Sequence, residues 1–418
     1  MNAPAHRFRY GSTYVDRRVP LPESLFQATA ASFDSLLHTA RFAADDWAYD
    51  LLTVAKAVYL ADRHSRRKDT DDHWTRSIDL QIPLAVPEAW DGTPTSALHE
   101  LLTLLTGDRW TIQLTHGGAA NGVDPLFDCP PAEEIALFSG GLDSTSYAAV
   151  RSQQCTPDQI LFIGYYHNPL KDRVENVLNN VWPEAHYRAV LQDVRKPREY
   201  SNRSRGLLYI ATAVWVASAH RTDSVTVPEN GQLAINPPLT AGRPGACSTH
   251  SVHPHTLELI NQIIASIGGT VRVSNPFAYR TKGEVCDLAR QAGMCPDAFW
   301  HTVSCGHPPS NDGAIIRAHC GQCFPCLVRR SSLHHAIGTD GSDYKTSQFW
   351  SRNHNDVFAL YLWLANPFSF RDLIADVPLP TDVDPTRLFG MLRRGRAELA
   401  NLFTDVPMSH PLHLDRAA

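Results

Sequence analysis

The sequence lacks any hydrophobic run long enough to cross a bilayer. Its longest apolar run, LLYIATAVWVASA at 207–219, falls short of the roughly 20 residues that a spanning helix needs. The first residues, MNAPAHRFRYGSTYVDRRVP, also lack the apolar segment of a secretion signal. We therefore expect no membrane partner and a cytoplasmic location.

Positive charge is scarce as well. Lys and Arg number 38 against 43 Asp and Glu, which gives a formal net charge of -5. The basic clusters, RHSRRK at 63–68 and LRRGR at 392–396, are short, and solvated helix faces or ends account for them more simply than nucleic-acid contact. A nucleic-acid partner is therefore not expected.

The cysteine pattern excludes a disulfide framework. The chain has 9 cysteines, an odd number, and most are scattered singly as small packing residues would be. No internal repeat indicates a solenoid, and a hydrophobic content of 43% is that of a globular protein. With 418 residues, the chain is long enough for a main domain of about 200 residues with appended parts.

Residues 1–131 are expected to form an α+β extension. Apolar residues at helical spacing predict a helix over 45–67, and a second helix is expected over 95–107. The segments 77–86 and 109–114 have the composition of strands. The Pro130–Pro131 pair marks the expected end of this extension.

From Ala132 the pattern changes to strands that alternate with helices. This alternation predicts a doubly wound, parallel, five-stranded sheet within 132–340. Such sheets bind ligands at the carboxyl ends of their strands, near the switch in strand order. The expected strands are 133–138, 159–166, 186–191, 224–229 and 270–275, and the expected helices are 143–153, 171–182, 205–221 and 256–268.

The remaining residues, 341–418, are expected to form a helical extension. The segment 354–377 has amphipathic helical spacing. Its apolar face could dock a neighbouring protein or pack back on the core, and packing on the core is the simpler reading. A homodimer remains an open alternative.

A glycine-containing turn follows the first strand of the expected sheet. ALFSGGLDST places two glycines, three hydroxyls and one aspartate where a helix begins. Glycine lets the backbone approach a ligand closely, and the free N–H groups of a helix start favour an anion. The turn is not a Walker loop, because no lysine follows it, and it lacks the third glycine of a dinucleotide fingerprint. It therefore predicts a phosphate site of another kind.

Four cysteines gather at 305–326. Cys305 precedes Cys320 by fourteen intervening residues, and Cys323 and Cys326 follow at two-residue gaps. Four thiolates at such spacing can hold one tetrahedral ion, which favours structural zinc. An iron–sulfur cluster stays an alternative, and so does a histidine in place of one thiolate. The histidines in reach are His301, His307 and His319.

The turn at 139–144 resembles the Ser-Gly-Gly-x-Asp-Ser loop of the PP-loop ATP pyrophosphatases. With the four-cysteine cluster, NRSRGLLYIATA at 202–213 and NPFAYRTKGEV at 275–285, the region 132–338 resembles QueC, the 7-cyano-7-deazaguanine synthase family. The segment 227–256 resembles divergent members from antiviral defence operons, the QatC type. The extra residues before and after this region depart from the usual family length.

The resemblance implies roles for particular residues. The expected ATP-binding residues are Ser139, Gly140, Gly141, Leu142, Asp143, Ser144 and Thr145. The expected catalytic residues are Asp143, Lys282 and Arg205, where Asp143 would orient Mg²⁺ or cap the loop, and Lys282 would face the leaving pyrophosphate. Arg203 is the alternative to Arg205 as a phosphate ligand, and the expected metal ligands are Cys305, Cys320, Cys323 and Cys326.

Substrate contacts are expected after the fourth strand. Glu229 and Asn230 would meet a guanine-like base there, although a plain loop role is the alternative. The segment 236–255 is a candidate lid with Arg243, assigned to the substrate, and His250, His253 and His255 as polar contacts. Tyr165–Asn168 would flank the adenosine, unless the tyrosines belong to the core.

The expected reaction uses ATP, Mg²⁺ and Zn²⁺ as cofactors. A substrate carboxylate of a 7-deazaguanine-type molecule would attack the α-phosphorus of ATP and release pyrophosphate, and an amine would then displace AMP. The amine is either ammonia or an amino group of a partner protein from the same operon. The alternatives are a housekeeping 7-cyano-7-deazaguanine synthase and a noncatalytic nucleotide-binding scaffold. A tRNA thiolation enzyme is less well supported, because no basic RNA surface is evident.

Overall fold

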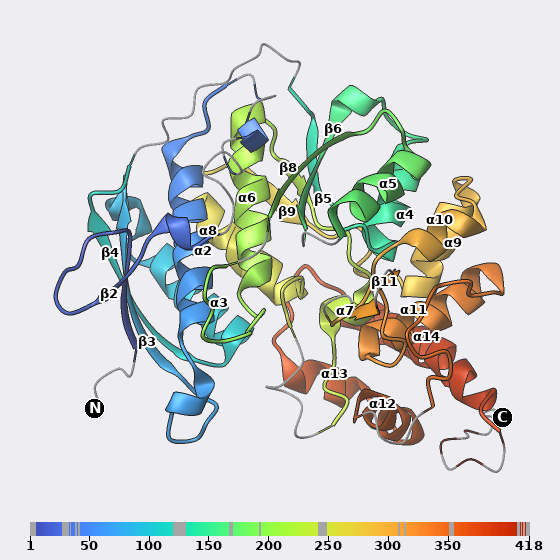
Figure 1. Cartoon of the computed structure of the whole chain (residues 1–418). Helices are drawn as coiled ribbons and strands as arrows, with labels where there is room; N and C mark the ends of the chain where they lie inside the picture. The colour runs from blue at the N-terminus through green and yellow to red at the C-terminus, as the bar shows by residue number, and fades with distance from the viewer. Residues whose placement is uncertain are drawn as a thin grey trace.

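The computed structural model describes residues 6–26, 33, 35–37, 40, 42–119, 131–166, 170–191, 194–240, 249–307, 310–312, 315–350, 355–407, 410, 412 and 414. Two parallel sheets dominate these residues, one drawn in blue to teal and the other in green to yellow (Figure 1). None of the described helices combines the length and apolar character needed to span a bilayer.

The central sheet is the doubly wound sheet that the sequence predicts. Its five strands lie in the order β7-β6-β5-β8-β9, and every neighbouring pair is parallel. The order reverses between β5 and β8, so the carboxyl ends of these two strands form the switch point. The strands are β5 Glu134–Leu137, β6 Ile160–Tyr166, β7 His186–Leu191, β8 Ser224–Thr226 and β9 Arg272–Ser274.

Helices cover both faces of this sheet (Figure 1). Helices α4, α5 and α9 pack on one face, where Phe138, Phe162, Val174 and Val285 are buried together. Helices α6 and α8 pack on the other face. Their bounds are α4 Leu142–Arg151, α5 Lys171–Val181, α6 Arg205–His220, α8 Pro254–Ser266 and α9 Lys282–Gln291.

The N-terminal extension contains both expected helices and both expected strands. Its sheet has the order β2-β1-β3-β4, and all its pairs are parallel, with α2 and α3 on one face. The two short strands β1 and β2 were not expected from the sequence. The bounds are β1 His6–Tyr10, β2 Val19–Leu21, α2 Asp46–His64, β3 Ser77–Leu84, α3 Thr93–Thr106 and β4 Arg109–His116.

The extension and the central sheet share one hydrophobic core. Helix α2 packs on α6, and α3 packs on α8, so the helices of the two sheets form adjoining layers. At the end of this interface, Arg76 is buried between Asp62 and Asp108, at 2.6 and 2.5 Å. Asp62 also accepts a hydrogen bond from Ser204 Oγ, 2.7 Å away, just before α6. Of the Pro130–Pro131 pair expected to end the extension, Pro130 lies outside the described residues.

The C-terminal part is helical, as expected. Within the expected segment 354–377, the described residues contain two helices, α12 and α13, and α12 packs on α11 and α14, which supports packing on the core. Short 3-10 turns occupy Glu23–Leu25, Ser35–Leu37, Arg67–Asp69, Pro87–Trp90 and Pro157–Gln159. The remaining elements are α7 Gly231–Ile235, α10 Pro296–His301, β10 Ser310–Asp312, β11 Ile315–Arg317, α11 Phe324–Ile337, α12 Asn355–Ala365, α13 Phe370–Asp376 and α14 Pro385–Thr404.

Candidate active site

The glycine turn lies at the carboxyl end of β5, at the switch point of the sheet. Gly140 has a φ of +70°, and a Cβ there would stand 3.0 Å from Cγ2 of Val174. Gly141 is the N-cap of α4, and its Cβ would stand 3.2 Å from the carbonyl oxygen of Val303. The first turn of α4 therefore begins on a tightly packed backbone that only glycine fits well.

Hydroxyl groups hold the turn in shape. Ser144 Oγ donates to the carbonyl of Gly141 at 3.2 Å and accepts from the backbone N–H of Ser139 at 3.3 Å. Ser139 Oγ accepts from the N–H of Gly141 at 3.3 Å. Thr145 Oγ1 is buried and has no hydrogen-bond partner among the described residues. Leu142 instead contributes its backbone, because its side chain lies in an apolar cluster.

Asp143 and Lys282 form a buried ion pair. Lys282 Nζ contacts Asp143 Oδ2, and the two side chains are only 3% and 8% exposed. Burial alone lowers the pKa of Lys282, but the carboxylates of Asp143 and Glu229 raise it above its usual value. The lysine is therefore a fixed positive charge beside the glycine turn.

Asn230 connects this ion pair to Glu229. Its side-chain nitrogen donates to Asp143 Oδ2 at 3.2 Å and to Glu229 Oε1 at 2.9 Å. Its side-chain oxygen accepts from the N–H of Leu233 at 3.1 Å and so caps α7. Burial and the charge of Asp143 raise the pKa of Glu229 well above its usual value. Four of the expected site residues therefore form one cluster: Asp143, Glu229, Asn230 and Lys282.

The two arginines at the start of α6 are placed differently. Arg203 Nη1 donates to the carbonyl of Thr106 at 2.8 Å, and its guanidinium lies 4.9 Å from the ring of Trp74. Arg203 thus connects the N-terminal extension to α6. Arg205 lies over the ring of Tyr209 at 5.8 Å, and no contact in the described part of the chain joins it to Asp143 or Lys282. Its phosphate-binding role stays a prediction.

The candidate lid is described only at its ends, and Arg243 lies outside the described residues. His253 caps α8 by accepting from the N–H of His255 at 3.1 Å, and burial lowers the pKa of His253 to about 3. His255 lies 2.7 Å from Glu100 of the extension. Both therefore have structural partners, whereas His250 is buried beside His253, with ring centres 5.6 Å apart.

The segment Tyr165–Asn168 is described only as far as Tyr166, the last residue of β6. Tyr165 is buried, stacks on Tyr209 at 3.9 Å and shares a hydrogen bond of 2.5 Å with Thr212, so the core alternative holds for it. His167 and Asn168 lie outside the described residues.

The four cysteines converge as the spacing predicts. Their sulfur atoms all lie within 4.8 Å of one another, with 3.8 Å from Cys305 to Cys323 and 3.9 Å from Cys320 to Cys326. Four thiolates at about 2.3 Å from one zinc ion stand about 3.8 Å apart in a tetrahedron. Backbone N–H groups point at these sulfurs, as from Cys323 to Cys320 at 3.3 Å. The donor set therefore fits zinc without a histidine.

The cysteine cluster is joined directly to the glycine turn. The N–H of Val303 donates to the carbonyl of Gly140 at 2.6 Å, and the N–H of Leu142 donates to Ser304 Oγ at 3.3 Å. The N–H of Ser304 in turn donates to Nε2 of His319, which precedes Cys320, at 3.2 Å. A metal in the cluster would therefore fix the segment that supports the turn.

Part of this chain is similar in sequence to proteins of known name. The chain is 26% identical over 170 residues to the 7-cyano-7-deazaguanine synthase of Allorhizobium ampelinum, a match that covers 40% of this chain and 61% of that protein. It is 27% identical over 225 residues to 7-cyano-7-deazaguanine synthase 1 of Sulfurisphaera tokodaii, covering 50% and 96%. The chain is QueC-like. No family model matches it.

A third relative of this QueC-like chain is the 7-cyano-7-deazaguanine synthase of Agrobacterium fabrum, 27% identical over 169 residues, with 40% of this chain and 61% of that protein covered. The chain thus spans about three fifths of the length of two of these three relatives. The expected resemblance to the QueC family is confirmed, whereas the comparisons do not reach the QatC subtype.

Three residues of this site were not predicted from the sequence. Gln232 Oε1 accepts from the backbone N–H of Lys282 at 2.9 Å, Ser304 accepts from the turn, and Glu398 accepts from the hydroxyl of Thr281. Gln232 and Ser304 each lie close in sequence to an expected site residue, which was the available signal. Glu398 had none, because it belongs to the C-terminal extension.

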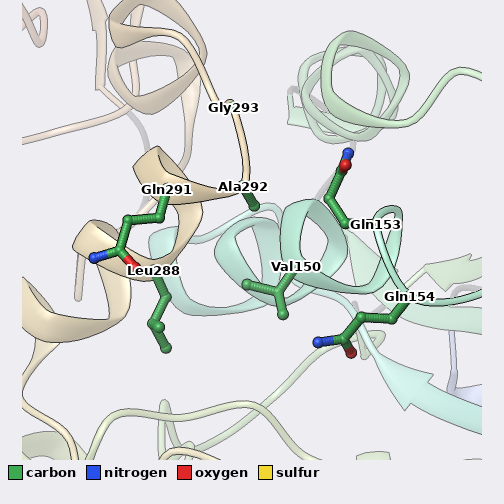
Figure 2. Close-up of a pocket in the computed structure, with 7 residues that line it drawn as sticks. All are labelled: Val150, Gln153, Gln154, Leu288, Gln291, Ala292 and Gly293. Atoms are coloured by element: carbon green, nitrogen blue, oxygen red, sulfur yellow. The ribbon is translucent and has the colours of Figure 1, made fainter.

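A depression elsewhere on the QueC-like domain does not coincide with this site. It lies between the last turns of α4 and α9, away from the glycine turn (Figure 2). Its lining has amide and aliphatic side chains but no titratable group, which gives it no means of proton transfer or charge stabilisation. The lining residues are Val150, Gln153, Gln154, Leu288, Gln291, Ala292 and Gly293.

Proposed function

We propose that this chain is an ATP-dependent enzyme that adenylates the carboxylate of a 7-deazaguanine-type substrate and passes it to an amine. The observation that carries the proposal is the buried Lys282–Asp143 pair beside the glycine turn, with Glu229 and Asn230 at the same edge. A helix start, a fixed cation and a carboxylate at a switch point suit a nucleotide and its partner substrate. The names of the relatives support the substrate class.

The outer two phosphates of ATP would bind at the glycine turn. The N–H groups at the start of α4 and the hydroxyls of Ser139 and Ser144 would bind the phosphate oxygens, and Lys282 would leave Asp143 to meet the departing pyrophosphate. A substrate carboxylate oxygen would form a bond to the α-phosphorus while the bond to pyrophosphate breaks. The pyrophosphate takes the electron pair of that bond.

An amine would complete the reaction. Its nitrogen attacks the acyl carbon, the bond to the AMP oxygen breaks, and the nitrogen loses a proton as the amide forms. This sequence makes the enzyme a carbon–nitrogen ligase. Glu229 and Asn230 would hold the base, and Arg243 and Arg205 stay proposed contacts to substrate and phosphate. Burial and the charge of Asp143 raise the pKa of Glu229, which favours its protonated form relative to an exposed glutamate.

Two metals are part of the proposal. Asp143 Oδ1 is buried without a hydrogen-bond partner in the described residues, which fits a ligand position for Mg²⁺. The ion would supply charge neutralisation to the phosphates. Zinc would occupy Cys305, Cys320, Cys323 and Cys326 in a structural role, since four sulfurs leave no open position.

Product analysis tests the proposal. Incubation with ATP, Mg²⁺ and a 7-deazaguanine that bears a carboxylic acid should yield AMP and pyrophosphate, and Asp143→Asn should abolish both. Release of ADP and phosphate as the sole products would show that the turn does not present pyrophosphate. No turnover under any condition, with ATP binding intact, would favour the alternative of a noncatalytic scaffold.

The proposal extends to the biological setting of the enzyme. We infer a cytoplasmic defence enzyme whose amine belongs to a partner protein, because the segment 227–256 resembles the defence-associated type and the extensions exceed the relatives' matched region. Mass spectrometry of a co-expressed neighbouring protein should then show an added deazaguanine mass. A nitrile formed from ammonia alone would instead favour the housekeeping synthase, the activity for which the relatives are named.

A further inference from the structure

One face of the C-terminal helix α14 packs on α9, which carries Lys282 of the ion pair, and on α7 (Figure 1). The face consists of Met391, Arg394, Gly395 and Glu398, at the spacing of neighbours on a helix. It meets α7, which Asn230 caps, and the first turn of α9, which begins at Lys282. We call these four residues the brace.

Three glycines lie at this contact, and each is approached closely by a side chain from the facing element. A Cβ on Gly231 would stand 2.5 Å from Cε of Met391, and a Cβ on Gly395 would stand 2.3 Å from Nε2 of Gln232. A Cβ on Gly283 would stand 2.7 Å from Oε2 of Glu398. Glycines on both sides of the contact therefore let α14 pack closely against α7 and α9.

Polar contacts fix the start of α9 in particular. Thr281 is the N-cap of α9 and forms a capping box with Glu284, and its hydroxyl donates to Oε1 of Glu398. Glu284 is in turn held by Arg394, whose Nε donates to Oε1 at 2.5 Å. Thr281 and Glu284, the two members of the capping box around Lys282, thus each have a hydrogen-bond partner in the brace.

The same face reaches Lys282 by a second route. Gly395 packs on Gln232, and Gln232 Oε1 accepts from the backbone N–H of Lys282 at 2.9 Å. The backbone of Lys282 is therefore fixed from its own N–H and from the residues on either side. Glu398 itself is buried, with 7% of its surface exposed.

We propose that α14 is a positioning element of the active site, and that Glu398 sets the position of Lys282 through Thr281. The inference rests on the proposed role of Lys282 toward pyrophosphate. It gives the C-terminal extension a function within the chain, because Glu398 and Arg394 of α14 are polar partners of Thr281 and Glu284 at the start of α9. A displacement of the lysine by about 1 Å is enough to lower a rate about a hundredfold.

Binding of inorganic pyrophosphate with Mg²⁺, measured by calorimetry, gives the first test. Glu398→Ala should weaken this binding at least about tenfold, whereas Glu398→Gln, which keeps an acceptor for Thr281, should retain most of it. Arg393→Ala, an exposed residue of the same helix, is the matched control and should change nothing.

AMP formation from ATP gives the second test. Glu398→Ala should lower kcat about tenfold to a hundredfold while the KM for the deazaguanine acid stays within about twofold, since the base lies on Asn230 and Glu229 instead. Thermal unfolding of each variant separates positioning from folding. Equal losses in Glu398→Ala and Glu398→Gln, or a loss that only follows the folded fraction, would overturn the inference.

The outcomes also separate the inference from the proposed function. If Lys282→Ala binds pyrophosphate as tightly as the unchanged protein, the role proposed for the lysine fails. If Lys282→Ala loses binding while Glu398→Ala keeps it with normal kcat, only the brace fails. Should Glu398→Ala not fold, Glu398→Asp, which withdraws the carboxylate from Thr281 by one methylene and leaves the N-cap of α9 intact, replaces it.

Discussion

Asp143 and Lys282 contact each other although 139 positions separate them, because each lies at the start of a helix that leaves the same edge of the central sheet. Both side chains are buried, so each charge depends on the other for compensation. The pair therefore links the architecture of the sheet to the proposed chemistry.

Removal of one charge of the Asp143–Lys282 pair should destabilise the fold, whereas removal of both charges should destabilise it much less. We expect Asp143→Asn and Lys282→Met each to lower the free energy of unfolding by about 3 kcal/mol, because each leaves a buried charge alone. The double variant should recover most of this loss, yet form no AMP. Denaturant unfolding and product analysis of the three variants measure both effects, and purely additive losses would contradict the coupling.

The glycine turn offers a test of backbone strain. Gly140→Ala should weaken ATP binding and lower stability by about 1–2 kcal/mol, because its φ is +70° and the new Cβ would meet Val174. Gly293→Ala is the control, since Gly293 has a φ of +91° but open space around it and lies at the distant depression. It should lose similar stability and keep ATP affinity. Equal ATP affinity in both variants would remove the turn from the site.

Local patterns explain how much of this site the sequence could predict. The turn at 139–144 and the cysteines at 305–326 are short motifs whose chemistry is visible in their spacing, and the structure places each as a unit. The strand expected over 224–229 is shorter, Ser224–Thr226, because Pro228 has no N–H for a sheet and the chain leaves the sheet at the switch point.

Features that depend on long-range packing could not be predicted from the sequence. Glu398 lies in an amphipathic helix where a glutamate normally faces water, and only the docking of α14 on α9 buries it. The short strands β1 and β2 also escaped, since HRFRY interleaves basic with aromatic residues and neither strand is long enough for a clear period. The position of Arg205 over Tyr209 likewise depends on the tertiary setting of α6.

Loss of zinc should lower AMP formation, although the metal has a structural role and takes no part in the proposed reaction. We expect Cys320→Ser to lose the metal and most AMP formation, because Val303 and Ser304 hold the turn and His319 holds Ser304. Cys295→Ser, an exposed cysteine outside the cluster, should keep both. Elemental analysis should find zinc in the unchanged protein, and the visible absorbance of an iron–sulfur cluster would contradict the assignment.

His220 should make the fold sensitive to mild acid. It is buried, and its Nδ1 accepts from the N–H of Ala132 at 3.0 Å, so protonation of Nδ1 would break this bond. Burial lowers the pKa of His220 to about 4, below its usual 6.5. The unfolded chain therefore takes up the proton first, and stability that is present above pH 6.5 is lost as the pH falls toward about 4.

The measurement is denaturant unfolding at several pH values. His220 should contribute a slope of about 1.4 kcal/mol per pH unit within that window. His220→Asn keeps a hydrogen-bond acceptor but does not titrate, so its stability should vary less between pH 6.5 and 4. An identical pH dependence for both proteins would show that His220 is already accessible to protons in the native state.

The continuous core predicts that the N-terminal extension and the QueC-like domain behave as one folding unit. Helix α2 is buried from Leu51 to Asp62 and packs on α6, and Arg76 connects Asp62 to Asp108 at the same interface. A protease site inserted after the exposed Ala119 should therefore yield two fragments that stay associated after cleavage and unfold in one transition. Burial of each aliphatic side chain in this layer stabilises the fold by about 1.5–3 kcal/mol. The sum is far more than an interface between independently moving domains provides. Asp62→Ala, which removes the acceptor of Ser204, should weaken the association of the fragments, whereas the exposed Asp69→Ala should not. Fragments of the unchanged sequence that separate on size-exclusion chromatography without denaturant would show that the two sheets form independent domains.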